Sequence, residues 1–191
     1  MEQVWAVPRA SLFRKHAFSG FLPAGKHDYL ASIRSDGSFV SRDAAETDPS
    51  LKQVIPYALF THGKKVFLYE RLAGERRLVR KRSLGIGGHI NPGDAQKGDL
   101  LSAALLREFS EEMQYPHPFE TKLLGYLNDE GDEVGAVHFG VVYLLAGSRP
   151  EIAAREVSSL RGELVPLSVL SGATLEGWSA LCLGALREAL E

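Results

Sequence analysis

Three carboxylates and one guanidinium fall within six consecutive positions of the chain, Arg107 to Glu112. On an α-helix, at about 100° per residue, Glu111 and Glu112 lie about 60° and 40° to either side of Glu108, so the three carboxylates share one face. A cysteine-free cluster of carboxylate oxygens suits hard divalent cations such as Mg²⁺ or Mn²⁺. A cation held there would polarise a phosphoryl oxygen and activate a bound water. The alternative is a solvated helix face that binds nothing.

A helix over residues 100–114 must position these carboxylates. Its apolar side chains fall beside them on the helical wheel, which predicts a buried face next to an acidic edge: Leu105, Leu106, Phe109 and Met113. Arg107 lies one helical turn before Glu111 and can orient a carboxylate or a phosphate. Like charges at this spacing cost about 0.2–0.5 kcal/mol per pair, so we expect a positive partner. Pro116 should end the helix, because a proline disfavours helical geometry at the residue before it.

Glycines precede this helix at Gly85, Gly87 and Gly88, and again in Pro92-Gly93-Asp94. They allow the backbone to pass close to a ligand and to turn sharply. No Lys-Ser or Lys-Thr pair follows, so the stretch does not form the phosphate loop of nucleoside triphosphate-binding proteins.

Glycines and helix together resemble the signature of the Nudix hydrolase family of MutT-like phosphohydrolases. That signature reads Gly-x5-Glu-x7-Arg-Glu-U-x-Glu-Glu-x-Gly-U, in which U is apolar, and the run from Arg107 to Glu112 matches its second half fully. The strands expected around the motif, over residues 53–170, also resemble the layout of the family.

The first half of the signature aligns in two ways. Aligning Gly93 and Asp99 with the first Gly and Glu of the signature keeps its strict spacing. Aligning Gly88 and Asp94 with them agrees better with the usual glycine-rich sequence of the first half and leaves a longer loop before the helix. We favour the second alignment. In both, an aspartate replaces the first glutamate of the family, and Gln114 replaces the closing glycine.

The resemblance implies a Nudix-type α/β/α sandwich with a mixed sheet, and attack of water on a diphosphate linkage with Mg²⁺ or Mn²⁺ as cofactor. By residue match, the implied metal ligands are Glu108, Glu111, Glu112 and the main-chain carbonyl of Gly87. The implied catalytic residues are Arg107, Glu108 and Glu111, together with a general base that varies within the family between a helix glutamate and an acid in a later loop.

An acidic loop that fits this last role runs from Asn128 to Glu133. Its charges belong either to a solvated hairpin tip or to a further metal ligand or base. For the second role we favour Glu130 or Glu133, and we place Glu133 among the catalytic candidates.

The net charge of −2 conceals two opposed segments. Residues 64–82 hold eight basic and two acidic residues, whereas residues 108–133 hold one basic and eight acidic residues. Arginine forks match phosphate oxygens in pairs, so the basic segment is either a phosphate-binding edge, with Arg71 and Arg82 as candidates, or a solubilising hairpin.

Two histidines and the single cysteine are of residue types that can bind metals or act in catalysis. His89, in the glycine loop, is a candidate substrate contact, and His138, in an apolar strand, is expected to be a hydrogen-bonded core residue. Neither has a second His or Cys at ligand spacing in the sequence. Cys182 shares helical spacing with Trp178 and Leu186 and is expected to be a buried packing residue.

Length and composition indicate an ordinary globular protein: 191 residues, 45% hydrophobic and 24% charged. The N-terminus lacks the pattern of a secretory signal, and no apolar run approaches the roughly 20 residues that span a bilayer. We therefore expect a cytoplasmic protein whose partner is neither nucleic acid nor membrane.

We expect residues 1–50 to form an N-terminal β-rich extension and residues 51–191 to form the Nudix hydrolase domain. The extension should hold a strand at residues 4–7, a hairpin of residues 29–34 and 38–42, and a loop at residues 43–50. It could serve as a lid, a homodimer contact or a specificity element. In the domain we expect strands at residues 55–60, 66–70, 76–82, 122–127, 134–145 and 162–165, and helices at residues 100–114 and 176–190. Pro56 should restrict its strand to an edge or an entry position.

The leading hypothesis is a hydrolase acting on a small, nucleotide-like phosphorylated substrate. One alternative is a catalytically inactive Nudix-fold module that binds or regulates, which the departures at Asp94 and Gln114 keep open. The other is an isoprenoid diphosphate isomerase, which would need a reactive cysteine that Cys182 is poorly placed to supply. The flanking residues that mark family subgroups are absent, so the subgroup stays unassigned.

Overall fold

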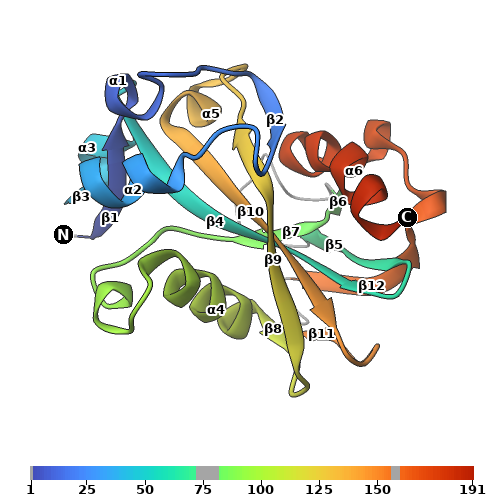
Figure 1. Ribbon diagram of the computed structural model, residues 1–191. Coiled ribbons are helices and arrows are strands. Elements are labelled where there is room, and N and C mark those ends of the chain that lie inside the picture. Colours follow the sequence, from blue (N-terminus) through green and yellow to red (C-terminus); the bar gives the residue numbers. More distant parts are fainter. Residues whose placement is uncertain (1, 72–81, 156–159) are drawn as a thin grey trace. The chain divides into compact units, whose positions relative to one another are not determined.

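The computed structural model describes residues 2–71, 82–155 and 160–191 (Figure 1). The strands are β1 (Gln3–Pro8), β2 (Gly20–Pro23), β3 (Ser38–Ser41), β4 (Leu51–His62), β5 (Lys65–Arg71), β6 (Arg82–Ser83), β7 (Gly85–Gly87), β8 (Met113–Gln114), β9 (Phe119–Asn128), β10 (His138–Gly147), β11 (Ala153–Ala154) and β12 (Leu160–Pro166). The α-helices are α1 (Arg9–Leu12), α2 (Leu30–Asp36), α3 (Arg42–Ala45), α4 (Leu100–Glu112), α5 (Glu133–Val137) and α6 (Gly177–Leu190). Single 3₁₀ turns form η1 (Asp94–Gln96), η2 (Leu167–Val169) and η3 (Gly172–Thr174).

Ten of these strands form one sheet, whose main path has the order β12-β5-β4-β10-β9-β2. Off this path, β1 pairs with β4 and β3, β6 pairs with β5, and β7 pairs with β4. β8 and β11 form a separate two-stranded sheet. The prediction of an α/β fold around a central mixed sheet is confirmed.

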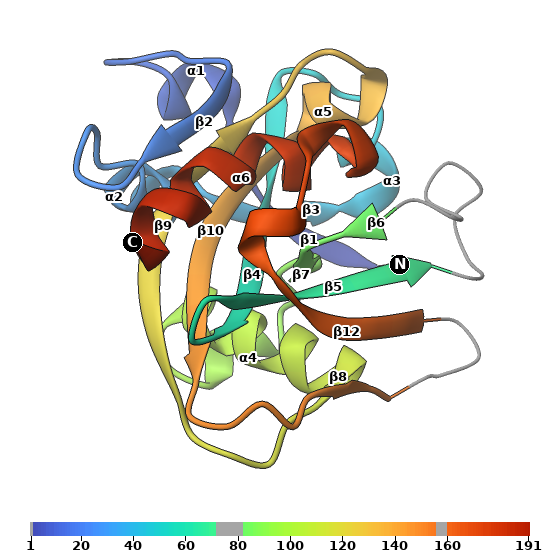
Figure 2. The same cartoon turned by 90° about the vertical axis from the view of Figure 1, so that its right-hand side faces the viewer.

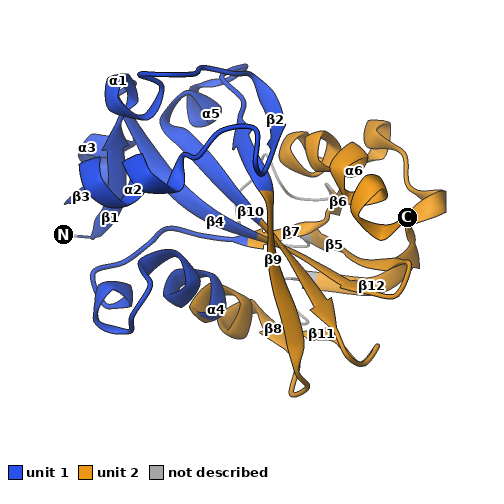
Figure 3. Ribbon diagram, in the orientation of Figure 1, with its two compact units in different colours: residues 1–57, 87–106, 125–142 blue, residues 58–86, 107–124, 143–191 orange. Residues whose placement is uncertain are grey.

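The chain divides into two compact units (Figure 3). The first comprises residues 1–57, 87–106 and 125–142, and the second comprises residues 58–86, 107–124 and 143–191. Within the first unit, β1 pairs antiparallel with the start of β4, where Ala6 lies opposite Gln53. The division of the chain at residue 50 stays a prediction.

The predicted N-terminal hairpin is wrong, because residues 30–36 form α2 and only the second strand of the hairpin, β3, is present. Tyr29 and Ile33 lie one helical turn apart, and both are fully buried. The Asp28 carboxylate accepts the N–H of Leu30 at 2.9 Å and so supports the start of the helix. A helical spacing of apolar residues thus outweighed the turn signal of Ser35-Asp36-Gly37. The expected loop at residues 43–50 also begins inside α3.

Two further expectations about strands need correction. The first four residues of the predicted strand 134–145 belong to α5, because the Asp132 side chain accepts the N–H of Gly135 at 2.7 Å and caps a helix there. Pro56 does not confine its strand to an edge, since β4 lies between β5 and β10 in the sheet. The strand predicted at residues 76–82 lies mostly outside the described residues.

The second unit follows its predictions more closely. β5 and β12 lie side by side in Figure 2 and are paired along seven residues. β9 and α6 form where they were expected. Glu176 caps α6 by accepting the N–H groups of Trp178 and Ser179 at 3.0 and 2.9 Å. No helix in the described part of the chain combines the length and apolar character needed to span a bilayer.

A buried lysine connects the acidic loop to β4 in the first unit. The Lys52 side chain is fully buried, and its Nζ lies 2.9 Å from Glu130 Oε1 and donates to the Gly135 carbonyl at 3.1 Å. Arg9 donates to both carboxylate oxygens of Glu130 at 2.9 to 3.1 Å. These partners, Arg9 first, lower the pKa of Glu130 to about 2. A carboxylate engaged in this way is a poor general base at neutral pH, which leaves Glu133 as the candidate from this loop.

Gly87, the last residue of β7, lies against the backbone of β4. A Cβ at this position would lie 2.5 Å from the Pro56 carbonyl oxygen and 3.2 Å from Tyr57 Cα. Backbone atoms cannot move aside as the end of a side chain can, so only glycine fits without displacing the strand.

We predict that Gly87→Ala lowers the free energy of unfolding by about 1–3 kcal/mol, because the added methyl group overpacks against β4. Gly93→Ala is the matched control, since a Cβ there meets nothing within 4 Å and its φ is −64°. It should leave stability within about 0.5 kcal/mol. Urea denaturation of the two variants measures the difference, and equal stabilities would contradict the close approach.

We predict that Glu130→Gln destabilises the protein by about 1–3 kcal/mol at pH 7, because it removes the counter-ion of buried Lys52. The folded pKa of Glu130, about 2, lies below its ordinary value of 4.5, so its stabilising effect is present above that value and fades as the pH falls toward 2. Unfolding free energies of wild type and variant should therefore converge between pH 5 and about pH 2. Exposed Glu120→Gln is the control, and a pH-independent gap would refute the linkage.

Candidate active site

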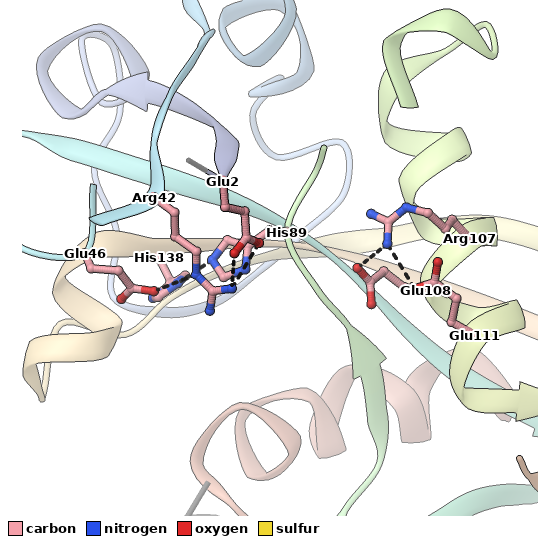
Figure 4. Close-up of polar contacts among 8 residues, drawn as sticks. All are labelled: Glu2, Arg42, Glu46, His89, Arg107, Glu108, Glu111 and His138. Atoms are coloured by element: carbon pink, nitrogen blue, oxygen red, sulfur yellow. Dashed lines mark hydrogen bonds and ion pairs between the residues drawn. The ribbon is translucent and has the colours of Figure 1, made fainter. Parts of the chain in front are cut away.

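The last turns of α4 carry the predicted carboxylates. Arg107 Nη1 lies 2.6 Å from Glu108 Oε1 and 3.2 Å from Glu111 Oε2 (Figure 4). The side chains of Arg107 and Glu108 are 17% and 16% exposed, whereas that of Glu111 is 59% exposed. The guanidinium therefore lies between two carboxylates and offsets their repulsion. It is the positive partner that the sequence led us to expect. The exposed carboxylate of Glu111 remains open to solvent.

The start of α4 is fixed by Asp99. Its carboxylate accepts the backbone N–H of Ser102 at 3.1 Å and the Ser102 hydroxyl at 2.8 Å, an N-terminal cap. Arg34 Nη2 lies 2.9 Å from the other carboxylate oxygen of Asp99. Burial raises the pKa of Asp99, but the hydrogen bonds from Ser102 and Arg34 and the charge of Arg34 outweigh it and leave this pKa lowered. The Asp99 carboxylate therefore serves as the N-terminal cap of α4.

The buried face of α4 holds the helix in place. Leu105, Phe109 and Met113 are buried, as predicted, but Leu106 is 47% exposed, contrary to prediction. Leu101 and Ala104 are buried as well. In the second unit, the Phe109 ring stacks on Phe60 with centroids 5.8 Å apart and meets Phe119 edge-on at 5.5 Å. Phe109 lies on the same helix as the glutamates, directly after Glu108 in the chain. Its packing therefore fixes the rotation of the helix and with it the direction in which the acidic edge points.

The end of α4 comes earlier than Pro116 alone predicted. The helix stops at Glu112, and Met113–Gln114 pairs with β11 instead. Arg155 replaces the missing helical partners: its backbone N–H donates to the Glu112 carbonyl at 2.8 Å, and its Nε donates to the Ser110 carbonyl at 2.5 Å. Nothing in the local sequence pointed to Arg155, which lies more than 40 residues from its partners in the chain.

The two aspartates that could align with the first acid of the signature both have structural roles. Asp94 is 1% exposed, and its carboxylate accepts the N–H of Asn91 at 2.8 Å, closing the turn before α4. Asp99 caps the helix. The choice between the two alignments stays a prediction.

The remaining candidates lie on other elements. Glu133 is the exposed first residue of α5, and Arg82 is exposed on β6. The backbone of Arg71 ends β5 opposite Leu160. The rest of the basic segment, residues 72–81, falls outside the described residues, so its contact with phosphate stays a prediction. Gly87, His89 and Glu133 belong to the first unit, whereas the α4 carboxylates belong to the second.

His89 and His138 meet in the first unit, which the sequence did not reveal. Their Nε2 atoms lie 3.3 Å apart (Figure 4). His138 is 8% exposed and hydrogen-bonded, as predicted. Burial, followed by the charge of Arg42, lowers the pKa of His89 to about 4, so its imidazole is neutral at physiological pH. Because 48 residues separate the two histidines in the chain, no local spacing could signal this contact.

Cys182 is fully buried in α6, as predicted, and burial raises the pKa of its thiol. A buried neutral thiol lacks the nucleophilic thiolate that covalent chemistry needs. The isomerase alternative, which depends on a reactive cysteine, is therefore weakened further.

Comparison with distant structures identifies the fold. The Nudix domain of Shewanella oneidensis NrtR, complexed with ADP-ribose, superposes with a TM-score of 0.58 and 18% identity over 73% of this chain and 89% of that domain. A bifunctional NMN adenylyltransferase/ADP-ribose pyrophosphatase from Francisella tularensis, complexed with AMP and a Mn ion, gives 0.52 and 16% over 73% of this chain and 42% of that protein. No protein-family profile matches the chain.

Two similar proteins extend over nearly the whole chain. Protein YmaB of Bacillus subtilis (strain 168) is 34% identical over 195 residues, which cover 93% of this chain and 94% of YmaB. The crystal structure of Tm1382, a proposed Nudix hydrolase, is 31% identical with a TM-score of 0.83, covering 98% of this chain and 100% of Tm1382. On this identity and coverage, the chain belongs to the Nudix hydrolase family.

Proposed function

We propose that this protein is a Mg²⁺- or Mn²⁺-dependent hydrolase that cleaves a diphosphate linkage in a nucleoside diphosphate derivative. The observation that carries the proposal is the arrangement at the end of α4, where Arg107 holds Glu108 and Glu111 together in a chain of the Nudix family. Membership of the family supports pyrophosphohydrolase chemistry, and the residues below supply it.

The donor set at the end of α4 fits a hard divalent cation. Glu108, Glu111 and Glu112 offer only carboxylate oxygens within two helical turns, and Mg²⁺ prefers such ligands. The carbonyl of Gly87 is the proposed main-chain ligand. When bound, the cation supplies charge neutralisation for the phosphates and lowers the pKa of a coordinated water.

The side chains around this cation have separate tasks. Arg107 orients Glu108 and Glu111 through the two contacts at 2.6 and 3.2 Å and compensates part of their charge. Glu111, more than half exposed, has access to the attacking water, and Glu133 is the alternative general base. Arg71, Arg82 and His89 are the proposed contacts to the substrate phosphates and nucleoside.

The substrate class follows from the chemistry of the site and from ligands of related folds. The carboxylates of Glu108, Glu111 and Glu112 would hold a divalent cation, which would neutralise the charge of a diphosphate. The NrtR Nudix domain complexed with ADP-ribose, and the bifunctional Francisella tularensis protein complexed with AMP, support a nucleotide-like substrate. The competing proposal, a Nudix-fold module that binds such a ligand without hydrolysing it, is supported by the aspartate and Gln114 departures from the signature.

A substrate screen separates these two proposals. We expect the protein to act on at least one of ADP-ribose, nucleotide sugars, dinucleotides or nucleoside triphosphates, with phosphate detected only after phosphatase is added, because diphosphate cleavage leaves phosphomonoesters. EDTA should abolish turnover and added Mg²⁺ or Mn²⁺ should restore it. Binding of ADP-ribose without turnover would favour the inactive module instead.

We predict that Glu111→Gln lowers kcat by at least about 100-fold, because the neutral amide no longer holds the cation or assists the water. Thermal stability should change by no more than a few degrees, since the side chain is largely exposed. Glu112→Gln should also abolish turnover. Glu120→Gln, an exposed glutamate on β9, is the control and should keep wild-type kcat. Near-normal activity in both α4 variants would overturn the proposal.

A further inference from the structure

Three side chains of a kind that bind metals converge in the first unit, from three separate segments. Glu46 follows α3, His89 lies in the loop after β7, and His138 begins β10. One ligand atom from each lies within 4.8 Å of the other two (Figure 4). The set combines two imidazoles with one carboxylate, which differs in chemistry from the all-oxygen set on α4.

The hydrogen bond made by His138 fixes which ring nitrogen faces the cluster as an acceptor. His138 Nδ1 lies 2.7 Å from the Val134 carbonyl oxygen. A carbonyl can only accept, so Nδ1 carries the proton and the neutral ring directs the lone pair of Nε2 toward His89. An Nδ1–H bonded to a backbone carbonyl is the arrangement that orients metal-binding histidines.

The distance between the two rings fits a shared cation. The His89 and His138 Nε2 atoms are 3.3 Å apart. Two nitrogens bound tetrahedrally at about 2.0–2.1 Å from one Zn²⁺ lie about 3.3–3.4 Å from each other. The rings therefore already have the separation that a common ion requires.

The surrounding charges also favour a cation. Arg42 Nε lies 3.3 Å from Glu46 Oε1, and Arg42 Nη1 lies 3.1 Å from both carboxylate oxygens of Glu2 (Figure 4). With neutral imidazoles, two carboxylates and one guanidinium leave the cluster with one net negative charge. Arg42 Nε donates a hydrogen bond to the Glu46 carboxylate, and ligating carboxylates commonly have such a hydrogen-bond partner.

We infer that Glu46, His89 and His138 bind one divalent transition-metal ion of the Zn²⁺ type. Imidazole nitrogen suits Zn²⁺ and Co²⁺, whereas Mg²⁺ prefers oxygen, so this site and the carboxylates of α4 select different ions. Three protein ligands leave a coordination position for water or for an oxygen of a ligand. The side chain of Glu46 is 36% exposed, so one side of the ligand set faces solvent. The competing explanation is a plain hydrogen bond between the two imidazoles.

Cobalt binding to the tag-free, metal-stripped full-length protein tests the inference. We expect one equivalent of Co²⁺ to bind and to give a visible absorption band of four- or five-coordinate cobalt, which one equivalent of Zn²⁺ abolishes. Glu46→Gln and His89→Ala should each weaken Co²⁺ binding at least about tenfold. His27→Ala is the control, because the ring of His27 stacks on that of His16 and is not part of the cluster. A band unchanged in both cluster variants, or no band in wild type, would overturn the inference.

A measurement on the unmutated protein covers the case in which a variant fails to fold. One equivalent of Zn²⁺ should shift the ¹⁵N resonances of the Nε2 atoms of His89 and His138, while those of His16 and His27 stay unchanged. Shifts confined to other histidines would refute the site. Glu111→Gln should retain the cobalt band, so loss of diphosphate hydrolysis and loss of this metal site are distinguishable.

Discussion

Like-charge repulsion at the end of α4 is the constraint on which the proposed chemistry depends. Three glutamates within two turns repel one another, and Arg107 offsets the repulsion by contacting two of them at 2.6 and 3.2 Å. Asp99 fixes where the helix begins, and Arg155 closes its last carbonyls. Phe109 sets the rotation of the helix by stacking on Phe60. These contacts make the acidic edge a fixed feature of the fold.

Within residues 2–71, 82–155 and 160–191, two sets of side chains of metal-binding type have different preferences. The α4 glutamates offer only oxygen, which suits Mg²⁺ or Mn²⁺, whereas Glu46, His89 and His138 offer nitrogen as well, which suits Zn²⁺. In both sets an arginine contacts a carboxylate: Arg107 contacts Glu108 and Glu111, and Arg42 contacts Glu46. An ion bound through histidine would also place a positive charge in the first unit, next to the loop that follows Gly87.

The α/β class, most strands of the second unit and the buried face of α4 could be predicted, because each depends on periodicity within one segment. The family could be predicted because the spacing from Arg107 to Glu112 lies within one helix. The N-terminal hairpin could not, since Tyr29 and Ile33 are buried by tertiary packing that overrides the turn signal. Arg155 as a helix cap and the meeting of His89 with His138 depend on chain segments that are distant in sequence, and no local pattern encodes them.

Hydrolysis in ¹⁸O-labelled water tests the central claim most directly. The substrate would be the best diphosphate from the screen, with Mg²⁺ present and the products read by mass spectrometry. The account predicts one ¹⁸O atom in one phosphomonoester product, because water attacks phosphorus, and no product without the cation. Unlabelled phosphomonoester products, or no cleavage of any diphosphate with Mg²⁺ or Mn²⁺, would contradict it.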